Sequence, residues 1–292
     1  MITWIRIAVI ITGLVLTTLV LLPFQLVGLV FDLKIRRYVP RLWHRVACYL
    51  LGIRIRVHGR LESRRPIMLA ANHASWKDIL VLGAVADVVY IAKTEVADWP
   101  VFGTLAKLQK TIFVMREQKR RTGDQVNEIA RRMTAGEIVV LFPEGTTSDG
   151  NRLLDAKSSL FGAATAAVPH TPEKVVYVQP VSIAYTGIYG MPMGRYHRPI
   201  AAWPGDIQLL PHLMGVFRAE AIDVDVDFGE AIPFREGGNR KQLSAAVLAS
   251  MRRMLRDRLY GVHQDAPDAV AAEETGLEPA VQSKPAPDDA GA

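Results

Sequence analysis

The stretch IMLAANHASWKD, residues 67–78, joins a short apolar run to a polar turn and then to the start of a helix-like segment. Its first five residues are apolar, which is typical of a strand buried on both faces. The residues from Ser75 onward carry a helix-start pattern and continue to residue 85. A buried strand followed by a helix is the repeating unit of parallel α/β sheets, because the helix carries the chain back to begin a parallel strand.

The rest of the chain repeats this alternation. Short, mostly β-branched runs predict strands at residues 53–57, 67–71, 88–92, 112–115, 138–142, 175–185 and 222–228. Helix-like segments are expected at residues 75–85, 102–108, 122–134 and 241–259. We therefore predict an α/β fold with a largely parallel sheet flanked by helices.

An apolar segment precedes this domain. Residues 7–31 contain no charged side chain. As one helix they would be about 37 Å long, which exceeds the roughly 30 Å of a bilayer's hydrocarbon core. Pro23 and a second apolar run at residues 42–53 leave open a helical hairpin that dips into one leaflet. We expect a membrane helix or a helical hairpin at the N-terminus.

The charges beside the apolar segment predict its orientation. Arg6 alone precedes it, whereas Lys34, Arg36, Arg37, Arg41 and Arg45 follow it. The positive-inside rule therefore predicts an inner-membrane protein whose domain faces the cytoplasm. We divide the chain into a membrane-anchoring segment (residues 1–52), a catalytic domain (53–262) and a disordered acidic tail (263–292).

The body of the chain is strongly basic. The net charge is +6, but the tail holds seven acidic residues and one lysine, so the first 262 residues carry 34 basic and 22 acidic groups. A basic body indicates an anionic partner. We expect a membrane with anionic lipids, because no helix-turn-helix, zinc-finger or RNA-binding motif accompanies the charge. Arginines on two predicted helices would face this lipid or an acidic protein partner: Arg131, Arg132, Arg252, Arg253, Arg256 and Arg258.

Polar residues follow four of the predicted strands. In open α/β sheets, ligands bind beyond the carboxyl ends of the strands, so we expect these residues to converge. They are His73, Lys93, Arg116 and the run Glu144-Gly145-Thr146. An imidazole, two cations and a carboxylate suit a site that acts on an alcohol carrying a nearby anion. The alternatives are a strand-ending turn at Glu144-Gly145 and plain surface charges at Lys93 and Arg116.

His73 and Asp78 form the candidate catalytic pair. On one continuous helix, five residues would turn the two side chains about 140° apart. If Ser75 is the N-cap, however, Asp78 lies in the first turn and points back toward His73. Asp78 would then accept a hydrogen bond from one imidazole nitrogen and leave the other free to take a proton. The alternative is that Ser75 and Asp78 only cap the helix.

Several other chemistries lack their motifs. The sequence contains no G-x-S-x-G elbow, P-loop, G-x-G-x-x-G fingerprint or H-E-x-x-H helix. Its one cysteine, Cys48, has no neighbouring Cys or His with which to bind zinc. We therefore expect neither a metal nor a cofactor.

Together, four blocks carry a family resemblance. They are Asn72-His73-x4-Asp78, Ile112-Phe113-Val114-x-Arg116, Phe142-Pro143-Glu144-Gly145-Thr146 and Val178-Gln179-Pro180-Val181. In this order they resemble the glycerolipid acyltransferases, which include the 1-acylglycerol-3-phosphate acyltransferases. One departure is Lys110, where many relatives have Gly.

The resemblance implies a role for each candidate residue. His73 would be the general base on the acceptor hydroxyl, with Asp78 as its orienting partner. Arg116, together with Lys93, would hold the acceptor's anionic group. Glu144, Gly145 and Thr146 would position the acceptor near a thioester. The reaction would move a fatty acyl group from acyl carrier protein or acyl-CoA to a lysolipid, giving a diacylated lipid.

The expected acceptor lipid rests on the resemblance of a shorter segment. Residues 205–212, with the anchor and the overall length, resemble a branch that includes lyso-ornithine lipid O-acyltransferases as well as lysophosphatidate enzymes. We favour lyso-ornithine lipid, with 1-acyl-sn-glycerol-3-phosphate as the alternative. Two further alternatives are a non-catalytic membrane scaffold and a lipid hydrolase that uses the same base on water.

Overall fold

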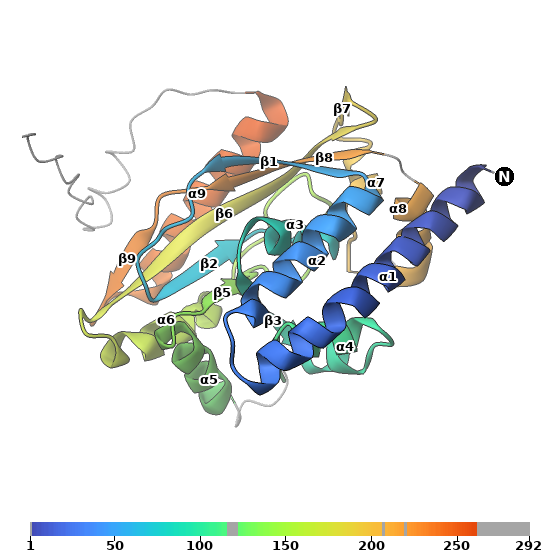
Figure 1. Ribbon diagram of the computed structural model, residues 1–292. Helices are drawn as coiled ribbons and strands as arrows, with labels where there is room; N and C mark the ends of the chain where they lie inside the picture. Colours follow the sequence, from blue (N-terminus) through green and yellow to red (C-terminus); the bar gives the residue numbers. More distant parts are fainter. Residues whose placement is uncertain (1, 116–121, 206–207, 219–220, 262–292) are drawn as a thin grey trace, which may run out of the picture. The chain divides into compact units, whose positions relative to one another are not determined.

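The computed structural model describes residues 2–115, 122–205, 208–218 and 221–261 (Figure 1). Its strands are β1 (Ile53–Gly59), β2 (Ile67–Ala71), β3 (Val88–Lys93), β4 (Ile112–Val114), β5 (Ile138–Leu141), β6 (Val175–Ile188), β7 (Met191–Pro192), β8 (Ile222–Phe228) and β9 (Ile232–Arg235). Its α-helices are α1 (Ile2–Val30), α2 (Ile35–Leu51), α3 (Lys77–Val85), α4 (Phe102–Leu108), α5 (Thr122–Thr134), α6 (Gly162–Ala167), α7 (Arg198–Ala201), α8 (Leu209–Arg218) and α9 (Arg240–Tyr260).

The strands form one mixed sheet in the order β1-β8-β6-β2-β5-β3-β4, with β7 and β9 added to β6. Strands β2 to β6 are parallel to one another. Strand β8 pairs with β6 antiparallel and β1 pairs with β8 parallel, so these two run against strands β2 to β6, as do β7 and β9, which also pair with β6 antiparallel. The prediction of an α/β fold with a largely parallel sheet is confirmed.

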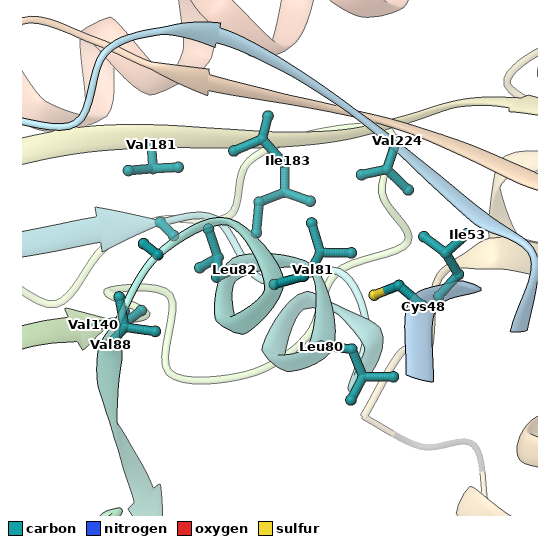
Figure 2. Packing of buried hydrophobic residues seen from close by; sticks show 14 of the residues in the cluster. Cys48, Ile53, Leu80, Val81, Leu82, Val88, Val140, Val181, Ile183 and Val224 are labelled. Carbon is teal, nitrogen blue, oxygen red and sulfur yellow. The ribbon is translucent and has the colours of Figure 1, made fainter. Parts of the chain in front are cut away.

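Helices cover both faces of the sheet. On one face, α3 packs under β6 and β8, with Val81 and Leu82 below Val181, Ile183 and Val224 (Figure 2). Helices α1, α2 and α8 add to this cluster. Helices α5, α6 and α9 cover the other face. The central strands β2 and β5 are buried throughout, which explains why they are apolar without alternation.

The N-terminal helices α1 and α2 form a hairpin that packs against the α/β body (Figure 1). Three hydrogen bonds fasten α1 along its length. Arg6 Nε donates to the carbonyl of Phe217 in α8 (3.1 Å), Trp43 Nε1 in α2 donates to Thr18 Oγ1 (2.9 Å), and Gln25 Nε2 donates to the carbonyl of Leu108 in α4 (2.7 Å). The outer face of α1 stays exposed, and residues 3–30 are long and apolar enough to cross a membrane.

Candidate active site

The strands that precede the candidate residues are neighbours in the sheet. Strands β2, β5, β3 and β4 lie side by side and parallel, so their carboxyl ends share one edge. His73 follows β2, Glu144 follows β5 and Lys93 ends β3. The three residues therefore lie at the same edge of the sheet, and His73 and Glu144 are in direct contact. Arg116 lies outside the described residues, two positions after the end of β4.

His73 and Asp78 are in direct contact. Nδ1 of His73 lies 2.8 Å from Asp78 Oδ2. The histidine side chain is 19% exposed, whereas the carboxylate is fully buried. An imidazole that donates its Nδ1 hydrogen to a carboxylate has Nε2 free to accept a proton. The predicted contact between the two side chains is confirmed.

Asp78 is also held by its own loop. Its Oδ2 accepts hydrogen bonds from the backbone N–H groups of Ala74 (2.7 Å) and Ser75 (2.8 Å). Its Oδ1 accepts one from the Tyr185 hydroxyl (2.7 Å). The same carboxylate therefore orients the imidazole and closes the turn, so the catalytic and the capping interpretations describe one geometry. The sequence analysis did not anticipate Tyr185, which comes from the distant strand β6 and has no local motif.

The start of α3 differs by one residue from the prediction. The N-cap is Trp76 rather than Ser75, and α3 begins at Lys77. Asp78 still falls in the first turn and still points back toward His73, as expected. The Ser75 hydroxyl instead accepts a hydrogen bond from Lys77 Nζ (3.1 Å).

Glu144 braces the loop that carries His73. Its Oε1 accepts a hydrogen bond from the backbone N–H of His73 (2.7 Å), and its Oε2 accepts one from the backbone N–H of Leu154 (2.7 Å). Burial raises the pKa of this carboxyl to about 7, against the opposing effect of these two hydrogen bonds. Because both oxygens are bound to backbone groups, the carboxylate fixes the backbone at His73.

The turn after β5 places an aromatic ring against the imidazole. Gly145 has φ +72° and donates its N–H to the Phe142 carbonyl (3.1 Å), closing a tight turn that favours glycine. The Phe142 ring stacks on the His73 ring at 4.1 Å between centroids and 17° between planes. Thr146 follows in the same loop and is exposed. The turn therefore restricts the imidazole on the face opposite to solvent.

Lys93 stands apart from the pair. It is exposed at the end of β3, where it pairs in register with Val114 of β4. With strands spaced about 4.8 Å apart, β3 lies roughly 10 Å from β2, and β4 roughly 14 Å. A substrate that reaches from His73 to Lys93 therefore spans the width of two strand spacings.

Lys77 is a buried cation that the sequence analysis did not single out. It is fully buried, and its Nζ donates to the Ala201 carbonyl at 2.5 Å. Burial lowers its pKa to about 7, although the neighbouring Asp78 charge acts in the opposite direction. Two residues further on, the Trp203 N–H donates to the Ala74 carbonyl (2.6 Å). The end of α7 and the residues after it are thus fastened to the start of α3 and to the His73 loop.

The comparisons with known proteins agree with this geometry. A family model for acyltransferases matches residues 54–184. The lyso-ornithine lipid O-acyltransferase of Rhizobium meliloti is 64% identical over 89% of each chain. The chain belongs to the acyltransferase family. The family's lyso-ornithine lipid O-acyltransferase from Brucella abortus is 48% identical over 89% of this chain and 98% of that one.

Two further matches are to acyltransferases that act on a glycerophosphate acceptor, by their names. The 1-acyl-sn-glycerol-3-phosphate acyltransferase of Neisseria gonorrhoeae is 30% identical over 68% of this chain and 74% of that one. The fold matches the crystal structure of a 1-acyl-sn-glycerophosphate acyltransferase from Thermotoga maritima, with a TM-score of 0.58 and 21% identity over 87% of this chain and 97% of that chain. The protein is an enzyme that transfers an acyl group to a lysolipid, as the motifs predicted.

Proposed function

We propose that this acyltransferase acylates the free hydroxyl of lyso-ornithine lipid to give ornithine lipid. The relatives at 64% and 48% identity, both named lyso-ornithine lipid O-acyltransferases, support this acceptor. The second candidate acceptor is 1-acyl-sn-glycerol-3-phosphate, which is supported by the relative at 30% identity.

The observation that carries the chemistry is the hydrogen bond between His73 and the buried Asp78. Asp78 holds the Nδ1 hydrogen, so Nε2 of His73 accepts the proton of the acceptor hydroxyl as its oxygen attacks the thioester carbonyl. The tetrahedral intermediate then collapses, the carbon–sulfur bond breaks, and the thiolate takes the proton from His73. A thioester is reactive enough for this direct transfer, which needs no covalent enzyme intermediate.

The acceptor's anion would bind at the edge of the sheet. We assign Lys93 and Arg116 to the carboxylate of ornithine, or to the phosphate of the alternative acceptor. Glu144 and Gly145 act indirectly in this proposal, since they shape the loop that positions His73. Thr146, which follows them in the same loop, would contact the acceptor.

The donor would be acyl carrier protein or acyl-CoA. Of the six arginines expected to receive it, five are already paired with carboxylates: Arg131 with Glu128, Arg132 with Glu137, Arg252 with Asp155, Arg256 with Asp257 and Arg258 with Asp227. An acidic carrier would have to compete with these internal partners, which lowers the contribution of this surface to docking.

Helix α1 would hold the enzyme in the membrane. Its exposed face is apolar, while its two ends are fastened to α8 and α4 of the same domain. A helix attached to the catalytic body along its whole length cannot cross the bilayer without burying that body. We therefore favour insertion into one leaflet, with the domain on the cytoplasmic face of the inner membrane and anionic lipids beside it.

A product assay tests the acceptor and the base together. Membranes containing the protein or its His73→Ala variant would receive labelled acyl carrier protein thioester, with either lyso-ornithine lipid or lysophosphatidate. We expect ornithine lipid from the first acceptor and its loss in the variant. Formation of phosphatidate alone would show that lysophosphatidate, not lyso-ornithine lipid, is the acceptor. Release of free fatty acid would indicate a hydrolase. Undiminished product from His73→Ala would refute the assignment of His73 as the general base.

A further inference from the structure

A pocket lined by several cations lies at the amino ends of the parallel strands, opposite the carboxyl ends that precede His73. It is lined by Val88 and Ile138, the first residues of β3 and β5, by the start of α2 and by the connection before β4. Val88 lies about 17 Å from Lys93 at the other end of the same strand. The charged residues that line the pocket are Arg36, Arg37, Arg41, Lys110, Asp87 and Glu137.

The carboxylates of this pocket are too few for its cations. Glu137 receives Arg132 Nε, Arg36 Nη1 at 3.7 Å and Lys110 Nζ at 3.8 Å, and Arg36 Nη2 also pairs with the exposed Asp32 at 2.9 Å. Burial lowers the pKa of Lys110, and the positive charge of Arg36 lowers it further. The crowding of cations around one carboxylate leaves the pocket favourable for an additional anion.

Hydrogen-bond donors are also unused here. The Arg36 Nε atom is buried and has no partner among the described residues. Within the same described part of the chain, the Arg37 side chain forms no hydrogen bond or ion pair, although its charge acts on the Asp87 carboxylate. Two guanidinium groups with free N–H donors are suited to the oxygens of a phosphate.

An apolar pocket adjoins the cationic one and shares Pro40 and Gln109 with it. Side chains from α1, α2 and α4 line it, including Leu21, Leu22, Val39, Trp43, Leu105 and Leu108. The end of α1 beside it exposes Val30 (74%) and Phe31 (68%). Clustered cations next to an apolar space, at the end of a membrane helix, match an amphiphile with an anionic head and a hydrocarbon chain.

We propose that the two pockets together bind one anionic membrane phospholipid that is not a substrate. Its phosphate lies among Arg36, Arg37 and Lys110, and one acyl chain enters between α1, α2 and α4. The proposal rests on the membrane association of α1 and is independent of acyl transfer. The bound lipid would tie the hairpin to the edge of the sheet.

Calorimetric titration of the full chain in non-ionic detergent tests the proposal without an acyl donor. The probes are dihexanoyl phosphatidylglycerol, dihexanoyl phosphatidylcholine and inorganic phosphate. We expect the phosphatidylglycerol to bind most tightly and Arg37→Gln to weaken it by about tenfold, the loss of one charged hydrogen bond. Leu22→Trp, which fills the apolar pocket, should weaken phosphatidylglycerol binding without changing phosphate binding.

The matched control is Arg235→Gln, which removes an exposed arginine at the end of β9 and should leave binding unchanged. Should Arg37→Gln fail to fold, Lys110→Gln removes a neighbouring cation of the same pocket. Equal binding of the two lipids, with no effect of either variant, would overturn the proposal. Phosphate binding as tightly as phosphatidylglycerol would show a free-anion site and refute the lipid. An inactive enzyme that still binds phosphatidylglycerol in this way would contradict only the proposed function.

Discussion

The Tyr185 hydroxyl donates a 2.7 Å hydrogen bond to Oδ1 of Asp78, on the carboxylate whose other oxygen holds His73. Strand β6, which lies next to β2 in the sheet, therefore contacts the His73–Asp78 pair. We expect Tyr185→Phe to lower kcat by about tenfold with little change in KM, because a buried charged hydrogen bond is lost while the acceptor's contacts remain. Steady-state kinetics would check this split, and a change confined to KM would contradict it.

Removing the charge of Asp78 should have a larger effect. Asp78→Asn keeps the size of the side chain but removes the negative charge that stabilises the imidazole once His73 has taken the proton. We expect kcat to fall by roughly 10²–10⁴-fold. His73→Ala made in the Asp78→Asn background should add little further loss, since the two residues act as one unit. Independent, multiplying losses would count against the pair.

The raised pKa of Glu144 predicts a pH-dependent stability. Its pKa of about 7 in the folded protein lies above the ordinary value of 4.5, so between these values the folded state binds more protons than the unfolded state. The contribution of Glu144 to stability is therefore present below pH 4.5 and is lost as the pH rises toward 7. Thermal unfolding in detergent from pH 5 to 7.5 should show a falling midpoint. Glu144→Gln should lack this part of the fall, and an identical slope in the variant would refute the assignment.

Lys77 predicts a change of opposite sign at higher pH. Its pKa of about 7 in the folded protein lies below the ordinary 10.5, so between these values the unfolded state binds more protons. The destabilisation caused by its buried charge is complete below pH 7 and disappears toward pH 10.5. We expect the thermal unfolding midpoint to rise between pH 7 and 10 because Lys77 loses its buried charge. Lys77→Met should remove this rise. Lys93→Met is the matched control, because Lys93 is exposed.

The packing of α3 should carry much of the stability around the pair. Leu82 is fully buried under β6, one turn after Asp78. Leu82→Ala should destabilise the protein by about 2–5 kcal/mol through the lost burial and the cavity left behind. Denaturant unfolding would measure it, and a cost no larger than that of an exposed substitution such as Leu210→Ala would be inconsistent with this packing.

The elements that the sequence predicted well are those whose signal is local. Strand β2 and helices α4 and α5 begin and end at the predicted residues, because a short apolar run or a complete helical pattern marks each. Helix α2 begins at Ile35, seven residues before the predicted apolar run, because its first turns are amphipathic and rich in arginine. Helices α6, α7 and α8 and strands β7 and β9 were not predicted, since they are short or depend on packing against distant elements.

The same distinction holds within the site. The His73–Asp78 contact follows from five residues of spacing and a helix start, so it was predictable. The contacts of Tyr185 and Ala201 with this loop join residues more than 100 positions apart, and no local pattern announces them. Lys110 shows what a departure from a family pattern means physically: it has φ +60°, a conformation in which glycine is unstrained.

The base and the proposed acceptor-binding side chains lie on different strands, with β5 between β2 and β3. The base loop is fixed by β6, by Glu144 and by the segment after α7, none of which includes Lys93. Substitutions at the ends of β3 and β4 can therefore accumulate without disturbing proton transfer. In this architecture, the residues that bind the headgroup can change at the ends of β3 and β4, while the proposed catalytic pair that follows β2 stays the same.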